Sequence, residues 1–236
     1  MKDIPPRERL IFALDVPDTH TARRIVDTLG DSVVFYKLGL ELLMAGDYYE
    51  LLDWMVGRGK KIFCDLKFFD IPATVAAAVR RLNGRGVTFT TVHGNQGIME
   101  AAVAAATDVK ILAVTVLTSL DRGDLDDLGF QCDVEQLVIS RARRALAAGC
   151  AGVVSSGIEA EAIRRELGDR LLVVTPGIRP VENRPEDDQK RVLTVERAFA
   201  AGADYIVVGR PIRDAADPRA AAESIQASIL AACSTR

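Results

Sequence analysis

Residues 61–74 read KIFCDLKFFDIPAT, and the fold class follows from this stretch and its repeats along the chain. Its first part, Lys61–Phe68, is a short and mostly apolar run, which is typical of a buried strand. Pro72 suits the first turn of a following helix, because the N–H that proline lacks would have no partner there. The stretch therefore predicts a strand followed closely by a helix, with charged residues at the junction.

The same pattern recurs from one end of the chain to the other. Apolar runs rich in Val, Ile and Leu alternate with Ala-rich amphipathic segments. We expect strands at Leu10–Val16, Val33–Leu40, Lys61–Phe68, Phe89–His93, Lys110–Leu117, Gly152–Ser155, Leu171–Thr175 and Tyr205–Val208. We expect helices at Thr19–Leu29, Leu42–Val56, Pro72–Leu82, Gln96–Ala106, Val134–Ala148, Glu159–Leu167, Val195–Ala201 and Pro218–Ala232.

Eight strands alternating with eight helices predict a parallel sheet. Eight such units in 236 residues match the size of a closed (β/α)8 barrel, and no linker divides the chain, so we expect one barrel domain over residues 1–236. An open, doubly wound sheet is the alternative. The longest polar stretches, Ser119–Asp133 and Pro180–Arg191, both follow strands, on the side where barrels build active sites.

Composition narrows the class of protein. The chain is 49% hydrophobic, which suits a globular core, and its net charge of −3 gives no basic field that would recruit nucleic acid. No apolar run approaches the roughly 20 residues of a membrane span, and the polar start of the chain does not resemble a signal peptide. The four cysteines form no C-x-x-C pair and there are only two histidines. We therefore expect a cytoplasmic protein without a His/Cys metal site.

Several expected strands end in charged residues. Asp15 ends the first and Lys37 lies late in the second, while Asp65 and Lys67 end the third and, being two apart, point to the same face. Asp70 follows just before the next helix. A structural ion-pair network at the barrel mouth would explain each charge singly. Together they favour a catalytic site, because buried charge is costly and clusters where chemistry needs it.

A second cluster has the features of a phosphate site. The seventh strand runs into Thr175-Pro-Gly-Ile-Arg179, and the eighth ends in Val207-Val208-Gly209-Arg210. The loops after strands seven and eight are the usual phosphate site of such barrels. Glycine lets backbone N–H groups approach the anion, and Arg210 can donate two parallel hydrogen bonds to it.

With these residues the chain resembles the orotidine 5′-monophosphate decarboxylase family over nearly its whole length. The third-strand block is the most specific part of the resemblance. The matching motifs are Ala13-Leu-Asp15, Tyr36-Lys-Leu-Gly39, Asp65-Leu-Lys-Phe-Phe-Asp-Ile-Pro-Ala-Thr74, Leu117-Thr-Ser119, Thr175-Pro-Gly-Ile-Arg-Pro180, Asp188-Gln189 and Gly209-Arg-Pro211.

The resemblance implies a carboxy-lyase that converts orotidine 5′-monophosphate (OMP) to UMP and CO2 in pyrimidine biosynthesis, without a cofactor or a metal. It implies that Lys67 stabilises the carbanion at carbon 6 and donates the proton. Asp65 and the Asp70 of a second subunit would flank that ammonium. Lys37 would bridge Asp65 and a ribose hydroxyl, and Asp15 would hold the ribose.

The resemblance also implies the substrate-binding residues and the assembly. Substrate would be bound by Asp15, Lys37, Thr74, Thr118, Ser119, Arg179, Gln189, Gly209 and Arg210. Gln189 would reach from a closing loop to both phosphate and pyrimidine, and either Thr118 or Ser119 would meet the pyrimidine edge. Asp70 and Thr74 would enter the neighbouring subunit's site, which implies a homodimer.

The chain departs from the family at two positions, with Phe69 where His is frequent and Ala73 where Asn is frequent. Two alternatives remain. The magnesium-dependent decarboxylases and synthases of keto-sugar phosphates share the barrel, but they place an acid where this chain has Lys37. A non-catalytic nucleotide-binding barrel is the other, although it would not need a proton donor between two acids.

Overall fold

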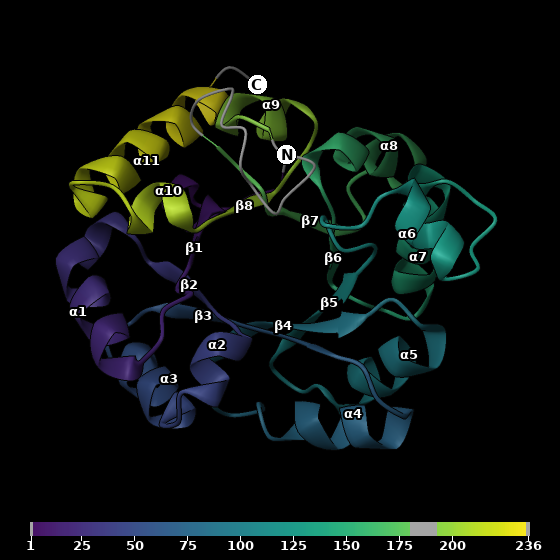
Figure 1. Cartoon of the computed structure of the whole chain (residues 1–236), viewed down its shortest axis with the longest axis horizontal. Helices are drawn as coiled ribbons and strands as arrows, with labels where there is room; N and C mark the ends of the chain where they lie inside the picture. Colours follow the sequence, from purple (N-terminus) through teal and green to yellow (C-terminus); the bar gives the residue numbers. More distant parts are fainter. Residues whose placement is uncertain (1, 180–192, 235–236) are drawn as a thin grey trace.

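The computed structural model describes residues 2–179 and 193–234, and its eight strands form a closed parallel barrel surrounded by helices (Figure 1). Each strand pairs with the next in the sequence, and β8 pairs with β1 to close the barrel. The strands are β1 (Leu10–Ala13), β2 (Phe35–Leu38), β3 (Lys61–Phe68), β4 (Val87–His93), β5 (Lys110–Val114), β6 (Gly152–Val154), β7 (Leu172–Thr175) and β8 (Tyr205–Val208). The barrel prediction is confirmed, and the open sheet is excluded.

Helices cover the outside of the barrel, and short ones line its rim. The α-helices are α1 (Thr19–Leu29), α2 (Leu40–Met44), α3 (Tyr48–Gly57), α4 (Pro72–Arg80), α5 (Gln96–Ala105), α6 (Arg122–Asp127), α7 (Val134–Ala147), α8 (Gly157–Leu167), α9 (Val195–Ala200), α10 (Arg210–Arg213) and α11 (Pro218–Ser234). Two short 3-10 helices are η1 (Pro6–Arg9) and η2 (Gly30–Ser32). In the described part of the chain, no helix has the length and apolar character needed to cross a membrane.

Side chains of the strands alternate between two apolar clusters, as the two-residue period of a strand requires. The residues pointing into the barrel are Ile11, Ala13, Phe35, Phe63, Phe89, Leu112, Val174, Tyr205 and Val207. Their neighbours in sequence, such as Phe12, Tyr36 and Cys64, belong to the larger cluster between the sheet and the helices. The barrel interior is therefore filled by side chains at this layer, and a ligand inside the barrel would have to lie beyond it, toward one end.

The expected helix at Leu42–Val56 is in fact two helices, α2 and α3. Gly46 and Asp47 separate them, and both have a left-handed backbone, with φ of 83° and 51°. The apolar periodicity continues across the break, so it gave no sign of the turn; left-handed backbone is the physical cause of the interruption. The predictions also missed the rim helices α6 and α10. Helix α10 has only four residues, too few to show a period, and α6 lies within the polar stretch Ser119–Asp133.

Candidate active site

A cavity of about 460 Å³ opens at the carboxyl ends of the strands. Eight of the residues predicted for the site line it: Asp15, Lys37, Asp65, Lys67, Thr118, Arg179, Gly209 and Arg210. Its remaining walls are mostly apolar, with Val114, Val116 and Leu117 on the β5 side. Its volume falls in the range typical of small-molecule sites.

The polar floor of this cavity continues the inward-facing period of the strands. Lys37 follows the inward-facing Phe35 by two residues, and Asp65 follows Phe63 by two. Each strand thus changes from apolar to charged on the same face, one step beyond the packed layer. Because that step lies at the edge of the core, the charged groups are held by the core and still open to the cavity.

Four side chains of alternating charge form a continuous network. Lys37 Nζ donates to Asp15 Oδ1 at 2.9 Å and lies 3.7 Å from Asp65 Oδ2. Lys67 Nζ donates to the same Asp65 oxygen at 2.8 Å. Asp65 is only 8% exposed, so two ammonium groups compensate one buried carboxylate.

Electrostatics keep this network ionised. Burial alone would lower the pKa of Lys37, but Asp65 and Asp15 outweigh it and raise that pKa above its ordinary value. Burial likewise would raise the pKa of Asp65, whereas Lys37 and Lys67 lower it below the usual range of a carboxyl. Attraction between opposite charges therefore dominates over desolvation at both residues.

Lys67 occupies an unusual backbone conformation. Its φ is 48°, and it shares a positive φ with only one other non-glycine residue, Asp47, in the part of the chain described. The pairing of β3 with β4 is irregular here, since Cys64 pairs with Thr90 and Phe68 with Val92, so that four steps on β3 match two on β4. A bulge of this kind re-aims a side chain at a cost of about 1 kcal/mol or more.

Thr91, on β4, fixes both the bulge and the buried acid. Its hydroxyl donates to Asp65 Oδ1 at 2.9 Å and accepts from the backbone N–H of Lys67 at 2.9 Å. The predictions missed it. The available signal was its position two residues after the inward-facing Phe89, which puts a hydroxyl on the inner face of the strand.

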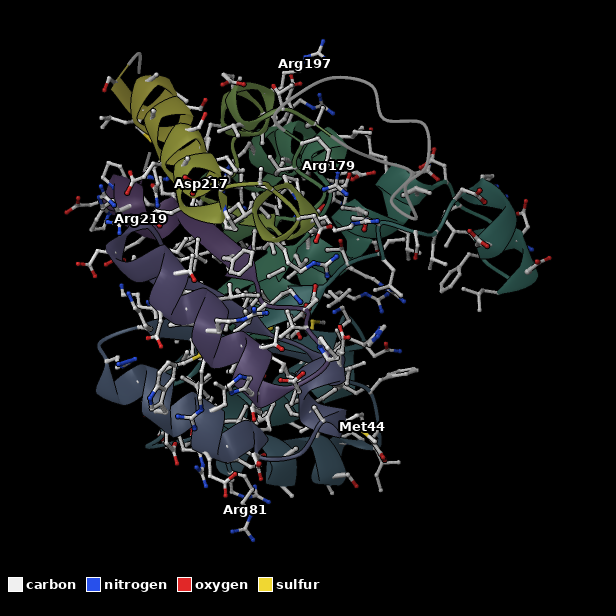
Figure 2. The ribbon with its side chains drawn as sticks, turned by 60° about the vertical axis from the view of Figure 1, so that its left-hand side comes forward. Met44, Arg81, Arg179, Arg197, Asp217 and Arg219 are labelled. Atoms are coloured by element: carbon white, nitrogen blue, oxygen red, sulfur yellow. The ribbon has the colours of Figure 1, made fainter. Side chains whose placement is uncertain are left out.

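The phosphate-like cluster lies at the other side of the same cavity. Gly177 has a φ of 79°, a conformation that favours glycine, in the turn between β7 and Arg179. Gly209 follows β8 and is the N-cap residue of α10, which begins at Arg210. Arg179, labelled in Figure 2, lies at the same end of the barrel as this short helix. A third cation, Arg213, also lines the cavity and was not predicted.

Three other predicted residues, Asp70, Thr74 and Ser119, do not line the cavity of this single chain. Asp70 and Thr74 are exposed, and Asp70 accepts a hydrogen bond from the N–H of Ile71 at 2.6 Å. Ser119 is exposed, whereas Thr118 faces the cavity. Gln189 lies outside the described residues. The roles assigned to all of these residues stay predictions.

No group of three or more His, Cys, Asp or Glu side chains in residues 2–179 and 193–234 is arranged to hold a metal ion. The carboxylates nearest each other in the cavity, Asp15 and Asp65, are separated by Lys37, which contacts both. The donor set therefore does not fit a divalent cation, because an ammonium occupies the place between the two acids.

Fold and site together define a class: a (β/α)8-barrel enzyme with alternating ammonium and carboxylate groups beside a cluster of three arginines. The comparisons agree. Residues 8–225 match the sequence profile described as "Orotidine 5'-phosphate decarboxylase / HUMPS family". The chain is 65% identical over 228 residues to the orotidine 5′-phosphate decarboxylase of Methylococcus capsulatus, covering 97% of this chain and 94% of that one. It is 53% identical to that of Stenotrophomonas maltophilia, covering 97% and 95%.

The solved structures give the same result. The crystal structure of orotidine 5′-phosphate decarboxylase from Lactobacillus acidophilus superposes with a TM-score of 0.82 at 35% identity, covering 94% of this chain and 99% of that one. The chain belongs to the orotidine 5′-phosphate decarboxylase / HUMPS family.

Proposed function

We propose that this protein is an orotidine 5′-monophosphate decarboxylase, which converts OMP to UMP and CO2 without a metal or cofactor. The observation that supports it best is the network in which Lys67 and Lys37 both contact Asp65. Two cations around one acid suit a reaction that develops negative charge on carbon and then needs a proton. The relatives at 65% and 53% identity over nearly the whole chain are both named orotidine 5′-phosphate decarboxylase.

The cavity offers matching surroundings for each part of OMP. Arg179 and Arg210 at one side would bind the phosphate, where guanidinium groups can donate paired hydrogen bonds. Asp15 and Lys37 would bind the ribose hydroxyls, because their charged atoms already form a hydrogen-bonded pair open to the cavity. The pyrimidine would then lie against the apolar β5 wall, with carbon 6 near Lys67 and the ring edge near Thr118.

The positive charge of Lys67 accounts for the steps of the proposed reaction. The bond between carbon 6 and the carboxylate breaks, its electron pair stays on carbon 6, and CO2 leaves. An ammonium about 4 Å from that carbon would stabilise the pair by about 4 kcal/mol at an effective dielectric near 20. The rate gains by the part of this energy that exceeds the attraction of the same ammonium to the carboxylate of bound OMP. Lys67 Nζ then gives its proton to carbon 6 and regains one from solvent. Asp65, at 2.8 Å, holds the ammonium in place.

We also propose that the active unit is a homodimer with shared sites. Asp70 and Thr74 are exposed on the rim, pointing outside their own chain's cavity, which fits a role in a second copy. Large apolar side chains are exposed in the segments that follow β2 and β3, including Met44 at the end of α2 at 82% (labelled in Figure 2) and Ile71, next to Asp70, at 66%. Such exposure is typical of a surface that another protein covers. A cytosolic location is our prediction from sequence.

A direct assay tests the activity. Purified protein is mixed with OMP in EDTA, and the ultraviolet change from OMP to UMP is followed. Turnover is expected without added metal. Turnover that vanishes in EDTA and returns with magnesium would point to the keto-sugar-phosphate relatives, and tight UMP binding without turnover would point to a non-catalytic barrel.

A subunit-mixing experiment tests the shared site. Lys67→Ala and Asp70→Ala should each be nearly inactive alone. After random exchange half of the dimers are mixed, and each mixed dimer has one site with both defects and one with neither, so about a quarter of all sites should regain activity. With exchange verified by mass-tagged subunits, no recovery would show that Asp70 serves its own chain.

A further inference from the structure

Arg213, the last residue of α10, donates hydrogen bonds to Asp15 in the loop after β1 and to its own neighbour Asp214. Its Nη1 donates to the backbone carbonyl oxygen of Asp15 at 2.8 Å. Its Nε and Nη2 donate to the two carboxylate oxygens of Asp214, at 2.7 and 3.1 Å. One guanidinium therefore links the loop after β1 to the helix after β8, across 198 residues of sequence.

Arg213 is tied rigidly to the predicted phosphate residues. Within α10, the N–H of Arg213 donates to the carbonyl of Gly209 at 3.0 Å, and that of Asp214 to the carbonyl of Arg210 at 2.9 Å. This single turn makes Gly209, Arg210 and Arg213 one unit. A shift of the phosphate-binding end would therefore displace the Arg213 side chain with it (Figure 1, α10 beside β1).

Asp15, by contrast, lies where the sheet no longer holds the backbone. The last residue pair between β1 and β2 is Ala13 with Lys37, so Asp15 is already in the loop. Its carboxylate accepts from Lys37 Nζ at 2.9 Å, and its carbonyl accepts from Arg213. These two contacts fix the carboxylate and the peptide group of the same residue, which sets where the carboxylate points into the cavity.

The positive charge of Arg213 is already balanced by the carboxylate of Asp214, so Arg213 differs from a residue that binds phosphate. The Asp214 carboxylate accepts hydrogen bonds from two nitrogens of the Arg213 guanidinium. This hydrogen bonding is the main cause that raises the pKa of Arg213. Asp15 receives a third donor. A guanidinium engaged in this way offers an added phosphate little net charge.

We propose that Arg213 is a positioning residue, which fixes Asp15, and through it the ribose hydroxyl, relative to the phosphate-binding helix α10. This rests on the proposed function, because the ribose and phosphate are those of OMP. Arg213 donates no proton and touches no reacting atom. It sets the distance between two parts of the site that bind one substrate, which matters because small misplacements slow an oriented reaction.

The test compares Arg213→Met with wild type on four substrates: OMP, its 2′-deoxy and 3′-deoxy analogues, and orotidine, which lacks the phosphate. On OMP, kcat/KM should fall about tenfold, the size expected for one lost charged hydrogen bond. The loss should also shrink on orotidine, because without a phosphate there is no second group from which Arg213 sets the distance to the ribose. On at least one deoxy analogue it should shrink to less than about twofold, because the hydroxyl that Asp15 binds is gone. Arg213→Lys, which keeps one donor, should lie between wild type and Arg213→Met.

Each other outcome overturns the inference. An equal loss on OMP and both deoxy analogues would mean that Arg213 acts elsewhere than through the ribose. A loss that is equal on OMP and both deoxy analogues but absent on orotidine would make it a direct phosphate ligand, and no loss on any substrate would leave it without a role. Should Arg213→Met fail to fold, Arg213→Gln is read in the same way. Absence of turnover by the wild type would instead overturn the proposed function, and this inference with it.

Discussion

The barrel has a charged network at each end, and the two differ in what their charges contact. At the amino ends of the strands, Asp204 binds Lys2 and Arg164, at 2.9 and 2.6 Å. These cations also donate to backbone carbonyls, Lys2 to Leu171 and Arg164 to Leu171 and Gly202. The N–H of Val173 donates to Asp204 as well, at 2.9 Å.

At the carboxyl ends the charges bind mainly one another. Lys37 and Lys67 make side-chain contacts with Asp15 and Asp65, and all four line a cavity. The difference shows that buried charge by itself does not mark an active site. Charged side chains that hydrogen-bond to backbone groups stabilise the fold. Charged side chains that face a cavity and contact other side chains can in addition form hydrogen bonds to a ligand.

The largest test of this contrast pairs one lysine with one arginine. Lys67→Ala should lower kcat by at least about a thousandfold, because it removes both the fixed positive charge and the proton donor. Its melting temperature should fall less than that of the matched arginine variant at the other end, because Lys67 is 32% exposed and Lys37 still contacts Asp65. Steady-state kinetics with OMP and a thermal melt measure both quantities.

Arg164→Met is the matched change at the opposite end. It leaves the almost fully buried Asp204 with one cation fewer, which should cost about 3 kcal/mol of stability and lower the melting temperature by roughly 6–12 °C. Its kcat/KM at a temperature where it is folded should remain within about threefold of wild type. A large loss of kcat/KM in Arg164→Met without a lower melting temperature would contradict the proposed difference between the two ends of the barrel.

A second test stays within the catalytic end and concerns the phosphate. Arg210→Ala should lower kcat/KM for OMP about a hundredfold, which corresponds to about 3 kcal/mol of lost charge-assisted binding. Orotidine should be affected far less, since it has no phosphate to lose, and phosphite should activate its turnover by wild type. Wild-type kinetics from Arg210→Ala would show that the phosphate binds elsewhere.

Thr91→Val tests whether the network of Asp15, Lys37, Asp65 and Lys67 depends on the neutral hydroxyl of Thr91. The substitution keeps the shape of the side chain and removes the hydroxyl that joins Asp65 to the backbone of Lys67. We expect kcat to fall about tenfold with little change in KM, because the contact orients the proton donor without touching the substrate. Thr90, which donates to the carbonyl of Cys64 away from the cavity, provides a control: Thr90→Val should leave kcat unchanged.

The smallest expected effect concerns acid. The folded protein lowers the pKa of Asp65, so this residue stabilises the fold above the ordinary carboxyl pKa of about 3.9, and that contribution is lost as the pH falls through the lowered value. Between about pH 5 and pH 3, the free energy of unfolding should therefore fall more steeply for wild type than for Asp65→Asn. Urea unfolding at several pH values measures this, and parallel curves would contradict it.

Much of the barrel could be predicted because its signal is local. The alternation of apolar runs and amphipathic segments predicted all eight strands and most helices, and the two-residue spacing of Asp65 and Lys67 predicted that both face the cavity. The backbone at Lys67 could not be predicted, since lysine has no preference for a positive φ. Only the surrounding structure imposes it.

Contacts between distant segments account for the other omissions. Thr91 acts on residues 24 and 26 positions away, and Arg213 on one 198 positions away, so no motif within either segment indicates its partner. Asp70 and Thr74 stay predictions for another reason. Their expected targets belong to a second copy, and one chain holds only half of such a site.

The network at the amino ends joins the start of the chain to its last strand. Lys2 contacts Asp204, and Arg9 donates to the backbone carbonyl of the same residue, across 202 and 195 positions. A ribosome adding about 5–20 residues per second needs roughly 10–40 s to make that stretch. During that time β1 has only one of its two neighbours, and its other edge is open to wrong pairing or to a chaperone. Ribosome-bound chains stopped before β8 should therefore be digested readily by protease, and resistance should appear only once β8 has emerged.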